Sequence, residues 1–144
     1  MEAVHANSSG NGYRGALTVK CQIIRPSGVF VYNKVAFDEI KEAVYRASKN
    51  VLGDKLEKVL LFGSYARGDF DKESDIDIFV LADIQLDETR AIGSSIVRLV
   101  GHLELEYDVV ISLHVTCSSI FHKFRSVTPY FMNVLKEGVE LSYA

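Results

Sequence analysis

The sequence predicts an α/β (α+β) domain in which helices flank a small mixed sheet. Segments with apolar residues at helical spacing alternate along the chain with short apolar runs typical of strands. The chain has 144 residues, which is the length of one domain. Apolar residues make up 48% of it, enough for a packed core, and this composition argues against global disorder.

The first 35 residues differ from the rest of the chain. Residues 6–12 are small and polar, which is typical of a flexible leader. Residues 17–24 and 29–32 carry aliphatic and aromatic side chains on either side of the turn-forming sequence Pro26-Ser27-Gly28, and they predict short strands. We therefore expect a leader and short strands over residues 1–35 and the domain over residues 36–144.

A helix and a buried strand open the domain. Apolar residues recur at helical spacing with charges between them, and Gly53 stands where this helix would end. The apolar run from Lys58 to Phe62 predicts a buried strand, and residues 64–67 then predict a short helix. The apolar positions of the first helix are Phe37, Ile40, Val44, Ala47 and Val51.

A loop, a strand and a long helix come next. Residues 69–74 are polar and predict a loop, and residues 75–81 turn from alternating to fully apolar, as a half-buried strand would. We expect Asp87 to cap the helix that follows. One side of this helix would carry Ile92, Ile96, Leu99, Val100 and Leu103.

The last part of the chain predicts a third strand and one or two helices. Residues 107–113 are the strand candidate, and residues 118–141 read as helical with a break near Pro129. Pro129 is also compatible with the first position of a second helix.

Charge and cysteine content exclude several classes of protein. The net charge of −3 disfavours direct nucleic-acid binding, because proteins that grip long nucleic acids are usually basic. Neither a membrane-length apolar run nor a secretory signal is present in the sequence. Cys21 and Cys117 match no metal-ligand spacing and are interpreted as reduced thiols. We expect a soluble, cytoplasmic protein, and the net charge is compatible with a small anionic substrate because a metal ion can supply positive charge locally.

Gly63 and Ser64 stand between a predicted strand and a predicted helix. Glycine lets the backbone approach a ligand closely, and the first turn of a helix offers free N–H groups. The Ser64 hydroxyl would add a further hydrogen bond to a phosphate. Taken alone, Gly63-Ser64 is a weak signal and favours an ordinary tight turn with a serine cap.

Two aspartates mark the start of the strand that follows the loop. Asp75 and Asp77 are two positions apart, so their side chains point to the same face of a strand. Such a pair repels itself unless a cation neutralises it, and Mg²⁺ prefers one or two carboxylates together with phosphate oxygens. Asp108 opens the third predicted strand and would join the pair if the two strands are neighbours. Three carboxylates suffice to hold two metal ions that share ligands.

These residues together carry a resemblance to a known family. Gly63, Ser64, Asp75 and Asp77 form the string G-S-x10-D-x-D, within Gly-Ser-Tyr-Ala-Arg-Gly and Ser-Asp-Ile-Asp-Ile. This string resembles the signature of the DNA polymerase beta-like nucleotidyltransferase superfamily. It is similar, more narrowly, to the minimal nucleotidyltransferase (MNT) antitoxins that act beside HEPN-domain toxins. Residues 134–141 also resemble the end of those domains, and the match in layout covers roughly residues 37–141.

The resemblance implies a fold and a role for each site residue. The fold would be that of the polymerase beta-like nucleotidyltransferases. Gly63 and Ser64 would hold the β- and γ-phosphates of ATP, with Arg67 as a further phosphate ligand or a surface arginine. Ser74 would orient the loop before the aspartates. Two Mg²⁺ ions would be bound by the carboxylates of Asp75, Asp77 and Asp108. Asp108 would also act as the base toward the acceptor hydroxyl.

The reaction implied by the resemblance is the transfer of AMP from ATP to a hydroxyl group of a HEPN toxin, expected to be that of a tyrosine. The protein would then act as an antitoxin. Two alternatives stay open: an antitoxin that neutralises the toxin by binding alone, and a small-molecule nucleotidyltransferase similar to the aminoglycoside-modifying enzymes. The complete motif argues against the first, and the short chain, which leaves no acceptor domain, argues against the second.

Histidines and aromatic residues outside this motif are interpreted as structural. His5, His102, His114 and His122 show no metal-ligand spacing, and packing is the favoured role for each. Aromatic side chains near the C-terminus favour packing of the last helix over a partner-binding patch. These are Phe121, Phe124, Tyr130 and Phe131.

Overall fold

The computed structural model describes residues 22–24 and 30–144. Two short strands, β1 (Gln22–Ile24) and β2 (Phe30–Tyr32), pair antiparallel, which confirms the strands expected there. The expected leader, the turn at residues 26–28 and Cys21 lie outside the described residues.

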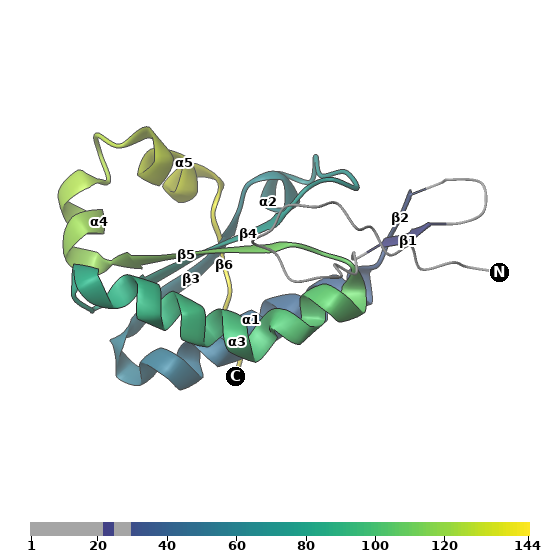
Figure 1. Cartoon of the computed structure of the whole chain (residues 1–144). Coiled ribbons are helices and arrows are strands. Elements are labelled where there is room, and N and C mark those ends of the chain that lie inside the picture. The colour runs from purple at the N-terminus through teal and green to yellow at the C-terminus, as the bar shows by residue number, and fades with distance from the viewer. Residues whose placement is uncertain (1–21, 25–29) are drawn as a thin grey trace.

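A four-stranded mixed sheet forms the centre of the domain (Figure 1). Its order is β5-β4-β3-β6, with β4 and β5 parallel and the other neighbours antiparallel. This arrangement confirms the predicted fold class. The strands are β3 (Leu56–Phe62), β4 (Ile76–Ala82), β5 (Ile111–Cys117) and β6 (Val139–Glu140).

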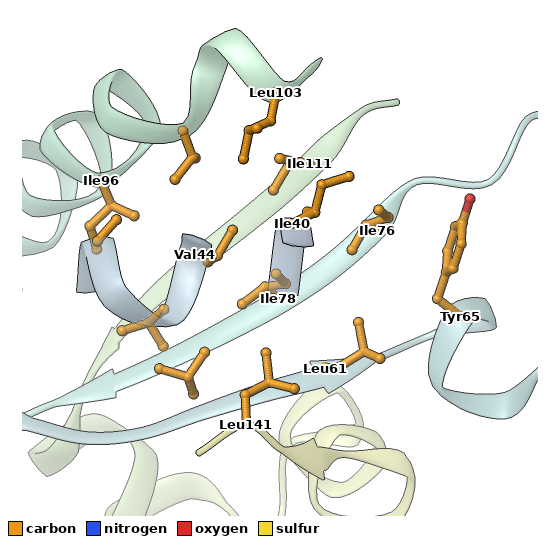
Figure 2. Close-up of a cluster of buried hydrophobic side chains, with 14 of the residues drawn as sticks. Ile40, Val44, Leu61, Tyr65, Ile76, Ile78, Ile96, Leu103, Ile111 and Leu141 are labelled. Atoms are coloured by element: carbon orange, nitrogen blue, oxygen red, sulfur yellow. The ribbon is translucent and has the colours of Figure 1, made fainter. Parts of the chain in front are cut away.

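Two long helices cover one face of this sheet. They are α1 (Lys34–Leu52) and α3 (Thr89–Tyr107), and Figure 1 shows them side by side. Ile76, Ile78 and Val80 alternate along β4 and point into this face, where their side chains are buried. Figure 2 shows the resulting core, in which Ile40 and Val44 of α1 lie opposite the strand residues.

The opposite face carries two shorter helices, α4 (Ser118–Phe124) and α5 (Pro129–Glu137). Its core is small and aromatic, and Phe79 lies at its centre with no exposed surface. Phe121 and Phe131 pack against Phe79 with ring centroids 5.6 and 6.1 Å away. The same face of β4 carries Asp77, so these helices stand beside the predicted catalytic face.

The helix ends follow from local chemistry. The Asn33 side chain accepts a hydrogen bond from the backbone N–H of Ala36 and caps α1, and Gly53 ends the helix with φ 55°. The predicted short helix is present as α2 (Ser64–Arg67). Pro129 occupies the first turn of α5, which confirms the second helix opened by this proline.

The predicted third strand is wrong by four residues. Asp108 does not begin a strand: it ends α3 in the left-handed conformation with φ 51°, which aspartate tolerates better than most side chains. The strand β5 starts at Ile111 because that residue is the first to pair with β4, and pairing continues to Cys117. Polarity alternates at residues 113–115, where the exposed His114 stands between the apolar Leu113 and Val115. This alternation is typical of a strand and agrees with the later start of β5.

Three smaller expectations also need correction. Asp87 does not cap α3, because Gln85 and Glu88 form the capping box of the 3₁₀ turn that precedes the helix. Leu99 is 46% exposed, whereas its expected neighbours Ile96, Val100 and Leu103 are buried. Residues 139–140, for which the sequence predicts the end of the last helix, form the strand β6 instead.

Cys117 is a buried free thiol, in agreement with the expectation for it. In the part of the chain that the structure describes, none of the helices is both long enough and apolar enough to cross a membrane.

Candidate active site

A sharp turn connects β3 to α2. Gly63 adopts φ 73° and ψ −155°, a conformation that is essentially restricted to glycine. A Cβ atom placed on Gly63 would lie 2.5 Å from Oδ2 of Asp77. The absence of a side chain at Gly63 therefore brings the backbone of the Gly63-Ser64 turn against the Asp77 carboxylate.

The two aspartates lie where β4 begins. Asp75 immediately precedes the strand, and Asp77 is paired with Phe62 on β3 and with Ser112 on β5. Alternation along the strand directs both carboxylates to one face. The Ser112 hydroxyl donates a hydrogen bond to Oδ2 of Asp75 over 3.1 Å, so the neighbouring strand helps to orient this carboxylate.

The environment of Asp77 opposes its ionisation. Burial raises the pKa of Asp77 above its ordinary value, and the negative charge of Asp75 adds to the effect. His114 and Arg67 lower this pKa, but the net shift is upward. A cation placed between the two carboxylates would remove the repulsion, which is the behaviour expected of a site for a hard metal ion.

Asp108 occupies a different position from the one expected. It is 2% exposed and lies in the turn after α3, three residues before β5. Among the described residues, no three His, Cys, Asp or Glu side chains are grouped so that they could hold a metal ion. Asp108 is not grouped with the strand aspartates in this way, and its role in the site stays a prediction.

Ser74 organises the loop that leads into β4. Its hydroxyl accepts a hydrogen bond from the backbone N–H of Asp71 over 2.9 Å and lies 3.2 Å from Oδ1 of Asp71. The same Oδ1 accepts from the backbone N–H of Glu73. These hydrogen bonds hold together the loop residues that directly precede Asp75.

Arg67 is held by two carboxylates. Its Nε lies 3.1 Å from Oδ2 of Asp69, and its Nη1 lies 2.9 Å from Oε2 of Glu137. The second contact connects α2 to the C-terminal end of α5. Arg67 is still close enough to Asp77 to lower the pKa of that carboxyl, so its charge acts within the site.

An aromatic platform borders the aspartates and was missed from the sequence. It consists of Phe62, His114 and Tyr130, whose ring centroids lie 5.7–5.9 Å apart. His114 and Ser112 both follow from strand pairing, because β5 places them beside Phe79 and Asp77. The alternation of polar residues along β5 would have indicated these two positions, whereas Tyr130 arrives from a helix distant in sequence.

The donor set fits a magnesium ion that is shared with phosphate groups. The pair of carboxylates supplies hard oxygen ligands, and the absence of a side chain at Gly63 lets the turn approach the Asp77 carboxylate. Mg²⁺ completes its coordination with substrate phosphates and water more often than with protein groups alone. Two protein carboxylates therefore suffice for such a site.

A comparison with known protein families finds one match over most of the domain. The family described as Polymerase beta, Nucleotidyltransferase matches residues 40–126. This range includes the Gly63-Ser64 turn, both strand aspartates and Asp108, and it ends before α5.

Two proteins of the archaeon Methanocaldococcus jannaschii are similar in sequence over most of their length. The first is 39% identical over 99 residues, which cover 69% of this chain and 90% of the relative. The second is 36% identical over 106 residues, which cover 72% of this chain and 99% of the relative. Each is named as a candidate protein adenylyltransferase.

Solved structures resemble the chain more distantly. A structure described as a minimal nucleotidyltransferase matches at a TM-score of 0.47 and 21% identity. The match covers 74% of this chain and 94% of the matched chain. An MNT antitoxin in complex with the tri-AMPylated HEPN toxin of Shewanella oneidensis matches at a TM-score of 0.44 and 19% identity. That match covers 74% of this chain and 72% of the other.

Proposed function

Because this chain belongs to the polymerase beta family of nucleotidyltransferases, we propose that it transfers AMP from ATP to a hydroxyl group of a partner protein, with Mg²⁺ as cofactor. The observation that carries the proposal is the contact between Gly63 and Asp77. This contact places a turn that can bind phosphate next to a carboxylate that can bind a metal ion. The transfer of a nucleotidyl group requires a phosphate-binding site and a metal-binding site side by side.

In the proposed mechanism, the turn holds the phosphates that leave. The backbone N–H groups after Gly63 and the Ser64 hydroxyl would bind the β- and γ-phosphates. Asp75 and Asp77 would hold the magnesium ion, with Ser112 fixing the orientation of Asp75. The ion would neutralise negative charge on the phosphates as the acceptor oxygen attacks the α-phosphorus and pyrophosphate leaves.

Positioning accounts for most of the expected rate enhancement. Residues of β3, β4 and β5 contribute to the site, so the sheet itself sets the distances between them. The Ser74 loop fixes the entry to β4, and Arg67 adds positive charge on the same side. Each of these groups binds or orients the substrate without forming a covalent intermediate.

A protein acceptor is favoured by the two archaeal relatives, which are aligned with this chain over 90% and 99% of their length. The finer identity of the acceptor rests on the sequence motif. Its resemblance to MNT antitoxins leads us to propose a HEPN toxin as partner and a tyrosine hydroxyl as acceptor. Modification of the toxin would then neutralise it.

Labelled ATP with Mg²⁺ tests this function directly. The native chain is expected to transfer label to a co-expressed HEPN partner, and Asp75→Ala/Asp77→Ala is expected to transfer none. Tight binding of the two proteins without transfer would contradict the proposal and favour an antitoxin that acts by contact. Transfer to an aminoglycoside but not to the partner would favour a small-molecule enzyme.

Asp108 is proposed as the third carboxylate of this site and as the base toward the acceptor. Asp108→Asn tests it, because asparagine also tolerates the left-handed conformation that residue 108 adopts. A loss of transfer of about 100-fold with unchanged thermal stability would support the carboxylate role, since general-base catalysis contributes 10²–10⁴-fold. Full activity of this variant, together with destabilisation by Asp108→Ala, would assign Asp108 to ending α3 alone.

A further inference from the structure

The aromatic platform of Phe62, His114 and Tyr130 lies on the same face as the Asp77 carboxylate. Phe62 pairs directly with Asp77 across β3 and β4, and His114 stands on β5 two residues beyond Ser112. The Tyr130 ring contacts Phe62, His114 and Phe79, with centroids 5.9, 5.8 and 6.3 Å away. Tyr130 therefore lies over β4, immediately beyond the metal-binding end of the strand.

One side of the platform packs on buried aromatic residues, and the other side is exposed to solvent. Phe79 has no exposed surface, and Phe121 and Phe131 behind it are 3% and 8% exposed. Tyr130 is nevertheless 38% exposed, and His114 is also exposed. A tyrosine that served only to fill the core would not keep this much of its surface in contact with solvent.

The charge state of Tyr130 is compatible with a position next to a bound triphosphate. Burial, together with the negative charge of Asp77, raises the pKa of Tyr130 to about 12, so the phenol stays neutral. A neutral ring next to phosphates and carboxylates adds no repulsion.

We propose that Tyr130, supported by Phe62 and His114, is the surface on which the base of the bound nucleoside triphosphate stacks. This inference rests on the proposed function, and it assigns a nucleoside-binding role to a helix outside the family match at residues 40–126. The nucleoside is joined covalently to the α-phosphate, so it must lie near Asp77 whenever the triphosphate is bound. A purine ring and an exposed aromatic face stack without needing a specific hydrogen-bond pattern.

The connection between α5 and α2 supports this assignment. Figure 1 shows both helices on the same side of the sheet, and the ion pair between Arg67 and Glu137 joins them. The ion pair therefore connects the helix that carries Tyr130 to the short helix that follows the turn proposed to bind the phosphates.

Binding of ATP and of inorganic tripolyphosphate, each with Mg²⁺, separates the base from the phosphates. Tyr130→Ala is expected to weaken ATP binding about tenfold, because stacking of a base on an aromatic side chain contributes roughly 1–3 kcal/mol and 1.4 kcal/mol is tenfold. Its affinity for tripolyphosphate should stay within about twofold of the native value. Tyr130→Phe keeps the ring and should bind both ligands normally. Met132→Ala, an exposed position on the same helix, is the matched control.

A fluorescence measurement provides a second test that does not depend on truncating the ring. The chain contains no tryptophan, so Tyr130→Trp introduces a single reporter. Its emission should change when ATP is added and should not respond to tripolyphosphate. Equal responses to both ligands would indicate a change of conformation and would overturn the stacking role.

The remaining outcomes decide between this inference and its alternatives. Native ATP affinity in Tyr130→Ala with slower transfer to the partner would overturn the inference and assign the platform to the acceptor. Parallel loss of ATP and tripolyphosphate affinity would overturn it in favour of a structural role. Failure of the native protein to bind either ligand would overturn the proposed function itself, and the inference with it.

Discussion

Single residues decide whether the turn proposed to bind phosphate and the carboxylates proposed to bind a metal ion can lie together, and Gly63 is the clearest example. Gly63→Ala would place a Cβ 2.5 Å from Oδ2 of Asp77, so the carboxylate or the turn would have to move. Displacing a catalytic group by about 1 Å can cost on the order of 100-fold in rate. We expect a loss of transfer of at least about this size, measured with labelled ATP.

Gly68→Ala is the matched control for this prediction. Gly68 also has a positive φ, 83°, but a Cβ there would meet no atom within 4 Å. Alanine in the left-handed region costs about 1–2 kcal/mol of stability. Gly68→Ala should therefore unfold more easily than the native protein while keeping its transfer rate. An equal loss of rate in both variants would show that strain, rather than the contact with Asp77, is responsible.

The charge of Asp77 is expected to lower the stability of the metal-free protein. Burial and Asp75 raise the pKa of Asp77 above the ordinary 3.8 in the folded state. The folded protein then holds this proton more tightly than the unfolded chain does. The corresponding stability is fully present below the unfolded pKa and is lost as the pH rises through the folded pKa. Asp77→Asn mimics the neutral form and should be the more stable protein at neutral pH, although inactive.

Urea unfolding in the presence of a chelator measures this effect. The difference in unfolding free energy between Asp77→Asn and the native protein should be small below pH 3.8 and should grow as the pH rises. Added Mg²⁺ should stabilise the native protein and reduce the difference. A difference that does not vary with pH would mean that packing, rather than ionisation, distinguishes the two proteins.

At the scale of elements, α5 depends on a close turn into β6. A Cβ on Gly138 would overlap the carbonyl oxygen of Val134, and it would also lie 3.4 Å from Cδ1 of Leu60. The backbone must therefore shift to accept any side chain. Forcing atoms into a packed site typically costs about 1–3 kcal/mol, so Gly138→Ala should lose free energy of unfolding in this range.

Gly101→Ala in α3 provides the comparison. A Cβ at Gly101 meets nothing within 4 Å, and alanine is more favourable than glycine in a helix by about 1 kcal/mol. Urea unfolding should show this variant to be as stable as the native protein or more so. If both glycine variants were destabilised equally, the loss could not be attributed to the contact with Val134.

The elements that depend on local pattern were predictable, and those that depend on pairing were less so. The spacing of Ile40 and Val44 and the glycine after Leu52 are properties of the helix itself, and the helix is found where they predict it. The start of β5 is set by the partner strand, since Ile111 is opposite Ile76. The apolar residues Val109 and Val110 continue the pattern without pairing as a strand, and they made the strand appear to start too early.

The same distinction applies to the site. Asp75 and Asp77 share a face because strands alternate, which a sequence can indicate by itself. The contact of Asp77 with Gly63 and the position of Ser112 depend on how three strands are placed side by side. Tyr130 reaches the platform from a helix more than 50 residues away from Asp77, so no spacing in the sequence indicates it.

At the scale of the whole molecule, the two faces of the sheet differ: one carries most of the apolar core, and the other carries the candidate site. The face under α1 and α3 carries most of the apolar core, whereas the face under α4 and α5 combines a small aromatic core with the aspartates. Charged groups that oppose folding are thereby placed at the edge of the second core and away from the larger one. Ligand binding on that face should consequently stabilise the entire domain.

Thermal unfolding with ATP and Mg²⁺ tests this coupling. A ligand at 100 times its Kd stabilises the folded state by about 2.7 kcal/mol, and each kcal/mol raises the Tm of a domain of this size by roughly 2–4 °C. We therefore expect an increase in Tm of roughly 5–10 °C for the native protein. ATP with a chelator should give a smaller increase, because the carboxylates then repel the phosphates. Asp75→Ala/Asp77→Ala lacks both proposed metal ligands and should show no dependence on Mg²⁺. The same increase in that variant would place the nucleotide away from Asp75 and Asp77 and would contradict the site derived from their contact with the Gly63 turn.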